Sequence, residues 1–183
     1  MDEIKLEATK ILGGADITIA GNRIIERDEL AMVSVAIPLG GDAALKRALN
    51  VGHELAMPSA TCSTISKNGM RAVNTAPDQM LLVFAHTTPD AEHHVQTGLN
   101  GTGYTTDQTD SLVAIEISGP DTMAAMERLC PLDLHPDNFG TDMAGRTVME
   151  HMAATIICLA DAHFLLLAAS SSGLSFLHAI ETS

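Results

Sequence analysis

Residues 131–139 contain the side chains whose types and spacing best suit chemistry. The segment reads PLDLHPDNF, so Asp133 and His135 alternate with leucines between two prolines. Proline restricts its own backbone and that of the residue before it, and the leucines could pack the segment against a core. A carboxylate and an imidazole held in this way could act as an acid–base pair. Together with Arg146 they could equally fix the loop by charge-assisted hydrogen bonds, contact a partner protein or bind a ligand.

The remaining polar residues match no standard catalytic or metal-binding motif. The eight histidines are scattered, and the neighbours His93 and His94 would point about 100° apart on a helix, whereas zinc needs converging ligands. Nucleophile elbows and phosphate-binding loops of the form GxxxxGK[ST] are missing from the sequence. Glu116 interrupts an apolar stretch, and a carboxylate there could hold an amine or a pterin ring, although such a position is more often on the solvent face of a sheet. The sequence therefore predicts no catalytic, cofactor-binding or metal-binding residue.

Composition limits the classes of partner. The 183 residues are 46% hydrophobic but only 3% aromatic, which predicts one aliphatic core or two small lobes. A formal net charge of -13 disfavours nucleic acid and anionic membranes as partners. The three cysteines have no paired spacing, which is typical of reduced thiols in the cytoplasm. We expect no signal peptide at the acidic N-terminus, and the apolar run at 165–169 is too short to cross a membrane.

The elements that would position these residues occur twice. When the sequence is shifted by 80 positions, residues 31–37 align with residues 111–117. Both segments alternate apolar side chains with a period of two, which is typical of a half-buried strand. Asp42 and Pro120 then stand where a helix would follow each strand, because acids and prolines favour the first helical turn.

A second pair of apolar runs, at 80–85 and 164–169, is offset by 84 positions. A polar cluster follows each run and predicts helices at 89–99 and 172–181, the second one capped by the serines at 170–172. Two short strands are expected ahead of each run, at 61–66 and 70–75 in the first half and at 146–151 and 153–159 in the second.

This order predicts an α+β fold of two pseudo-repeated ferredoxin-like βαββα units, with helices covering one face of largely antiparallel sheets. Residues 104–106 are a candidate for one more strand, and Asn68-Gly69 predicts a hairpin turn. The predicted organisation is an N-terminal arm or added strand at 1–30, a first repeat at 31–110 and a second at 111–183, together forming one compact unit. The two halves could form separate lobes or one continuous sheet layer.

The loop also carries a family resemblance. The segment LCPLDLHP at 129–136, followed by Phe139, Gly140, Arg146 and His151, resembles the gamma subunit of heterotetrameric sarcosine oxidase. Three more motifs agree with that family, namely APDQMLL at 76–82, ISGPD at 117–121 and SFLHA at 175–179. The chain departs from the family pattern in having no tryptophan, and in having Ala169 and Ser170 where a basic residue is common.

The resemblance implies a fold similar to the folate-binding domains of the glycine-cleavage aminomethyltransferase. It also implies a non-catalytic subunit of a cytoplasmic complex that oxidatively demethylates an N-methyl amino acid and transfers the one-carbon unit to tetrahydrofolate. In that family the FAD, FMN, NAD, tetrahydrofolate and zinc belong to the alpha, beta and delta subunits, and the gamma chain packs against the folate-binding end of the large alpha subunit. Three alternatives stay open: the equivalent subunit of N-methylglutamate dehydrogenase, a stand-alone folate-dependent aminomethyltransferase-like enzyme, or a small-molecule binding module.

Overall fold

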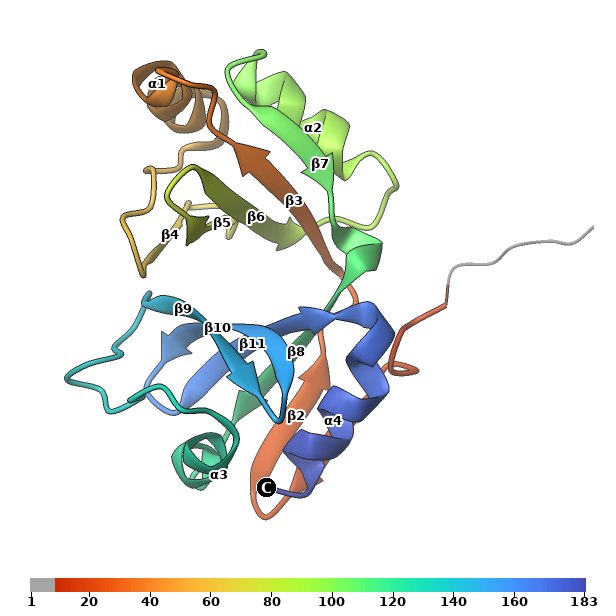
Figure 1. Ribbon diagram of the computed structural model, residues 1–183. Helices are drawn as coiled ribbons and strands as arrows, with labels where there is room; N and C mark the ends of the chain where they lie inside the picture. The colour runs from red at the N-terminus through yellow and green to blue at the C-terminus, as the bar shows by residue number, and fades with distance from the viewer. Residues whose placement is uncertain (1–8) are drawn as a thin grey trace, which may run out of the picture.

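Two antiparallel sheets face each other in the computed structural model, which describes residues 9–183, and two helices cover the outer face of each sheet (Figure 1). The first sheet has the strand order β1-β2-β8-β11-β10-β9, and the second has the order β4-β5-β6-β3-β7. The strands are β1 (Asp16–Ile19), β2 (Asn22–Glu26), β3 (Leu30–Ala36), β4 (Ser63–Ile65), β5 (Arg71–Ala76), β6 (Gln79–Ala85), β7 (Tyr104–Asp107), β8 (Leu112–Ser118), β9 (Ala144–Met149), β10 (Met152–Ala160) and β11 (His163–Ala169). The helices are α1 (Asp42–His53), α2 (Ala91–Leu99), α3 (Thr122–Leu129) and α4 (Gly173–Glu181).

The internal repeat and the α+β class predicted from the sequence are confirmed. The order β3-α1-β4-β5-β6-α2 recurs as β8-α3-β9-β10-β11-α4. Each half therefore has three strands between its two helices, whereas the predicted βαββα unit has two. The extra strand is present because both of the short strands expected ahead of each apolar run are formed. Every pair is antiparallel, so the parallel central pair of a split βαβ arrangement is not formed within the part of the chain that the structure describes.

The strand register corrects the offset of the repeat. Ser34 pairs with Leu81 in one half, and Glu116 pairs with Leu165 in the other. β3 and β8 therefore correspond at an offset of 82 residues, not 80. A shift of two residues leaves every side chain on the same face of a strand, so the alternation of apolar residues could not detect the difference.

Residues 1–30 were expected to form an arm or an added strand. Of these, residues 16–26 form the β1–β2 hairpin, and β2 pairs with β8 at the edge of the second repeat. After this hairpin the chain crosses at residues 27–29 from the six-stranded sheet to the five-stranded sheet. Residues 1–8 of the expected arm lie outside the described part of the chain.

Three apolar clusters hold the layers together. Phe164 and Phe176 belong to the cluster between the six-stranded sheet and its helices, and Leu45 and Leu82 belong to the matching cluster of the five-stranded sheet. A third cluster joins the inner faces of the two sheets. Its members are Met32, Val73, Leu81, Val83, Ala114, Ala144, Ile157, Leu165 and Leu167. The halves are therefore neither separate lobes nor one continuous layer, but two sheets packed face to face.

A polar contact joins the halves where β4 and β9 begin. Cys62 and Met143 form an isolated β-bridge, and the Ser63 N–H donates to the Asp142 carbonyl at 2.7 Å. The Arg71 guanidinium, with its side chain 10% exposed, donates to the Asp142 carboxylate at 2.5 Å. This contact fixes the start of β9, and with it the end of the loop that precedes β9.

The predicted cap of the last helix is wrong. Residues 170–172 form a 3₁₀ turn ahead of α4, and the Gly173 N–H donates to the Ser170 carbonyl. Ser172 occupies the N-cap position without a side-chain hydrogen bond to the helix.

Candidate functional site

The loop at 131–143, between α3 and β9, has a fixed conformation. Leu134 and Phe139 are only 2% and 7% exposed and belong to the core of the six-stranded sheet. The Asp133 carboxylate accepts hydrogen bonds from the His135 backbone N–H at 3.1 Å and from the Asn138 side-chain amide at 2.5 Å. These two donors hold the pKa of Asp133 below its usual value, so its carboxylate is ionised at neutral pH.

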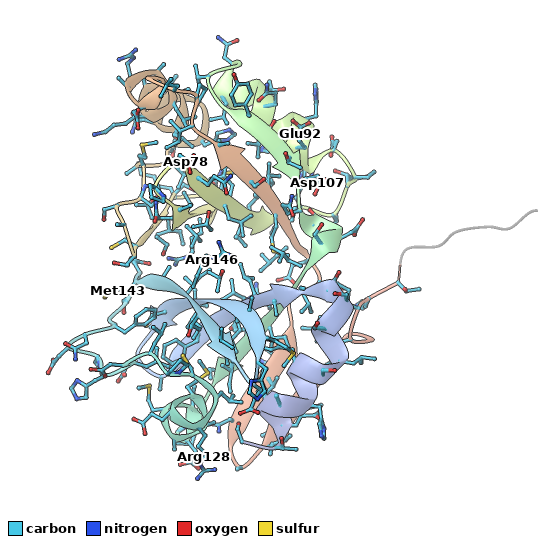
Figure 2. The ribbon with its side chains drawn as sticks, viewed as in Figure 1. Asp78, Glu92, Asp107, Arg128, Met143 and Arg146 are labelled. Atoms are coloured by element: carbon cyan, nitrogen blue, oxygen red, sulfur yellow. The ribbon has the colours of Figure 1, made fainter. Side chains whose placement is uncertain are left out.

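The structure brings together only two of the three predicted site residues. Asp133 contacts the backbone of His135, while the His135 ring accepts from the Asp137 N–H at 3.3 Å and lies 3.6 Å from the Asp137 carboxylate. Arg146 is exposed on β9 and shares a face with Ala144, which packs between the sheets (Figure 2). The ion pairs found within residues 9–183 include none between Arg146 and either residue. The loop is therefore fixed by its own backbone and by Asn138, not by a set of three charges.

A cavity of about 220 Å³ lies beneath this loop. Leu134, Pro136 and Phe139 form its loop side, and Met123 of α3 and Phe164 of β11 contribute to its apolar walls. Asp161, in the turn between β10 and β11, also lines it. This cavity could not be predicted from the sequence because its walls come from several segments that are far apart in the chain.

Glu116 is the most buried carboxylate that contacts an imidazole. Its side chain is 13% exposed, it lies 2.7 Å from Nε2 of His163, and it accepts a hydrogen bond from Arg27. Partial burial alone would raise the pKa of Glu116, but the His163 and Arg27 contacts outweigh it, so the pKa lies below its ordinary value. Arg27 also pairs with Glu29 at 2.5 Å, in the segment that crosses from one sheet to the other.

The sequence suggested that Glu116 lies on the open, solvent-facing side of a sheet, whereas in the structure it is partly buried against Arg27 and His163. Arg27 is 89 residues away from Glu116 in sequence and His163 is 47 residues away, so neither partner could be found from local spacing. The carboxylate already has two partners, and the three residues include no serine, threonine or cysteine. The arrangement can hold a charge and fix the crossing segment, which is a structural role.

A larger cleft of about 770 Å³ opens between the crossing segment and the loop before α2. Its volume lies in the range of ligand pockets. Its walls contain two ion pairs, Lys10 with Asp28 at 2.9 Å and Arg27 with Glu29 at 2.5 Å. Glu26 accepts from the backbone N–H groups of Leu12 and Gly14 at 2.8 Å and 2.6 Å. Asp107, labelled in Figure 2, also lines this cleft.

Three of the eight histidines gather near Phe84. The rings of His86 and His94 stack with centroids 5.5 Å apart, and His53 approaches His94 edge-on at 5.9 Å. The buried His53 ring makes a 3.1 Å hydrogen bond to the carbonyl of Val95, and burial lowers its pKa. Within residues 9–183, no group of three or more His, Cys, Asp or Glu is arranged to hold a metal ion. The contacts of these imidazoles with one another and with Phe84 contribute to packing between the helices and the end of β6.

The cysteines and helices add two further observations. Cys62, Cys130 and Cys158 are free thiols, and burial raises the pKa of Cys158. None of the helices described at residues 9–183 combines the length and the apolar character needed to cross a membrane.

Comparison with known proteins identifies the fold. No family model matches the sequence, and neither does any curated protein. A chain of the heterotetrameric sarcosine oxidase from Corynebacterium sp. U-96, solved in complex with pyrrole 2-carboxylate, superimposes with a TM-score of 0.77 at 20% identity. The match covers 94% of this chain and 88% of that one, so the two chains are similar in length.

The glycine cleavage system aminomethyltransferase T from Bartonella henselae superimposes with a TM-score of 0.61 at 11% identity. That match covers 88% of this chain but only 45% of the aminomethyltransferase. At these identities the likeness shows the fold alone. The chain therefore has the duplicated α+β fold of these two proteins, as the resemblance implied.

Proposed function

We propose that this chain is a non-catalytic, gamma-type subunit of a sarcosine oxidase-type complex. The complex would oxidatively demethylate an N-methyl amino acid and transfer the one-carbon unit to tetrahydrofolate in the cytoplasm. The observation that carries the proposal is the nearly end-to-end match to a chain of a heterotetrameric sarcosine oxidase. The loop motif at 129–136, which resembles the gamma subunit, agrees with it.

The arrangement of polar groups supports a non-catalytic role. In the described residues 9–183, no buried side-chain nitrogen or oxygen is without a hydrogen-bond partner. The best acid–imidazole contact, Glu116 with His163, is occupied by Arg27. We therefore assign the FAD, FMN, NAD, tetrahydrofolate and zinc of the complex to partner alpha, beta and delta subunits.

Purification of the tagged chain from its source organism tests the proposal. We expect a larger flavoprotein to co-purify, to show flavin absorbance, and to be bleached by sarcosine or another N-methyl amino acid. A chain that elutes as a monomer without flavin would refute the assignment. Comparing sarcosine with N-methylglutamate as the reductant separates the sarcosine oxidase from the related N-methylglutamate dehydrogenase.

A second candidate is a stand-alone, folate-dependent aminomethyltransferase-like protein, which the match to aminomethyltransferase T favours. The chain spans less than half of that enzyme, so a complete active site would have to form from this part alone. Calorimetric titration of the isolated chain with tetrahydrofolate distinguishes the two candidates. Saturable heat would favour the second candidate, whereas the subunit role predicts none.

A further inference from the structure

We propose that the cavity beneath residues 131–139 is the anchor point for the larger flavin-binding partner. The partner would insert one aliphatic or aromatic side chain into the cavity and place a basic side chain beside it. This inference rests on the proposed function and extends it, because it names the surface and the chemistry that recognises the partner.

The size of the cavity selects the occupant. At about 220 Å³ it is smaller than the roughly 300–1,000 Å³ of pockets that bind cofactors and other small molecules. It is large enough for a single large apolar side chain. Its walls include Met123, Leu134, Phe139 and Phe164, which would exclude water around that side chain. Such a pocket with a polar rim has the anatomy of an interface hot spot.

The charges at the rim select the flanking residue. Asp161 lines the cavity, and Asp137, whose side chain is 88% exposed, follows Pro136 of its wall. Asp133 lies on the same loop and is held ionised by its hydrogen bonds. No lysine or arginine is among the described residues that line the cavity. A partner surface that presents a lysine or an arginine next to its apolar anchor is therefore complementary.

The loop is also preorganised for binding. The buried Leu134 and Phe139 hold it to the core, and the two hydrogen bonds to Asp133 fix its turn. Another backbone bond, from the Phe139 N–H to the His135 carbonyl at 2.8 Å, closes the loop. A surface that is already ordered loses little conformational entropy when a partner docks on it.

The test uses the tagged full chain produced in its source organism, with flavin absorbance per tagged chain as the readout. Asp137→Lys combined with Asp161→Lys reverses the charge of the rim at two exposed positions. Thr141→Trp places an indole at the cavity, which Thr141 lines. Glu54→Lys combined with Asp78→Lys is the matched control, since both acids are exposed in the first half and the net charge changes equally.

We expect the wild type and the control to retain the flavoprotein. The two test variants should each recover roughly tenfold less flavin, as hot-spot changes do, with unchanged melting temperatures. Full recovery with the rim variant would refute the basic flank, and full recovery with Thr141→Trp would refute the anchor cavity. Absence of flavin from the wild-type preparation would instead refute the proposed function itself.

Discussion

Replacing Gly52 with alanine tests how the first repeat packs its two helices. A Cβ atom at Gly52 of α1 would lie 2.2 Å from the carbonyl oxygen and 2.8 Å from the Cα of Gly98 in α2. Carbon atoms in favourable contact are about 3.5–4.0 Å apart, so the added methyl group requires α1 and α2 to separate by about 1 Å. The obstacle is backbone, which cannot rotate away as a side chain can.

Two opposing contributions determine whether Gly52→Ala raises or lowers the free energy of unfolding. Alanine is favoured over glycine inside a helix by about 1 kcal/mol, and by less in the last turn, where Gly52 lies. Overpacking costs about 1–3 kcal/mol, and separation of the helices also weakens the packing of His53 against Gly98. We therefore expect Gly52→Ala to lower the free energy of unfolding by about 1–2 kcal/mol, which is about 2–8 °C in melting temperature for a chain of this size.

Urea and thermal unfolding followed by circular dichroism measure this effect. Asn50→Ala, at an exposed position of the same helix, is the control and should change stability by only a few tenths of a kcal/mol. If Gly52→Ala proved as stable as the control or more stable, the close approach of α1 and α2 would be wrong.

Three further predictions follow from buried or fixed charges. Glu116→Gln should lower the free energy of unfolding by about 1–2 kcal/mol in urea titrations, because Arg27 loses a charged partner but keeps Glu29; unchanged stability would contradict the ion pair. Burial lowers the pKa of His53 from 6.5, so the folded state binds fewer protons than the unfolded one, and stability should fall as the pH drops below about 6.5. His53→Gln should reduce this slope, and an identical slope in the variant would assign the effect to another group. Asp133→Ala removes two hydrogen bonds of the loop, so it should speed hydrogen–deuterium exchange at residues 135–139 and weaken assembly of the complex. A variant complex that assembles fully but has lost its chemical step would instead mean that Asp133 acts in catalysis.

Local sequence patterns predicted the order of elements well. The Asn68-Gly69 signal lies in the turn between β4 and β5, where Gly69 has a φ of +87° that glycine adopts readily. The helices after Asp42 and Pro120 are formed close to where they were expected. These features depend on residues that are neighbours in the chain, so a single sequence contains the information.

The long-range geometry could not be predicted from the sequence alone. Alternation of apolar residues could not separate an offset of 80 from one of 82, because both keep the same face buried. Arg146 is near Asp133 in the sequence, but it lies on β9 and faces the other sheet, because strand pairing and not distance along the chain decides which side chains meet. The assignment of Asp133, His135 and Arg146 to an interface stays a prediction.

The corrected register shows where the two halves diverged. Glu116 occupies the place of Ser34, and His163 occupies the place of Gln79, at the same paired positions of the duplicated strands. The two ionisable residues are thus present only in the second half, and the third member of their cluster, Arg27, comes from the segment that crosses between the sheets. A partly buried ion pair at the point where the chain changes sheets fixes the connection between the two sheets. The Glu116 cluster thus serves the connection between the two sheets, whereas the ordered loop at 131–139, with its exposed Asp137, is the surface proposed to bind a partner.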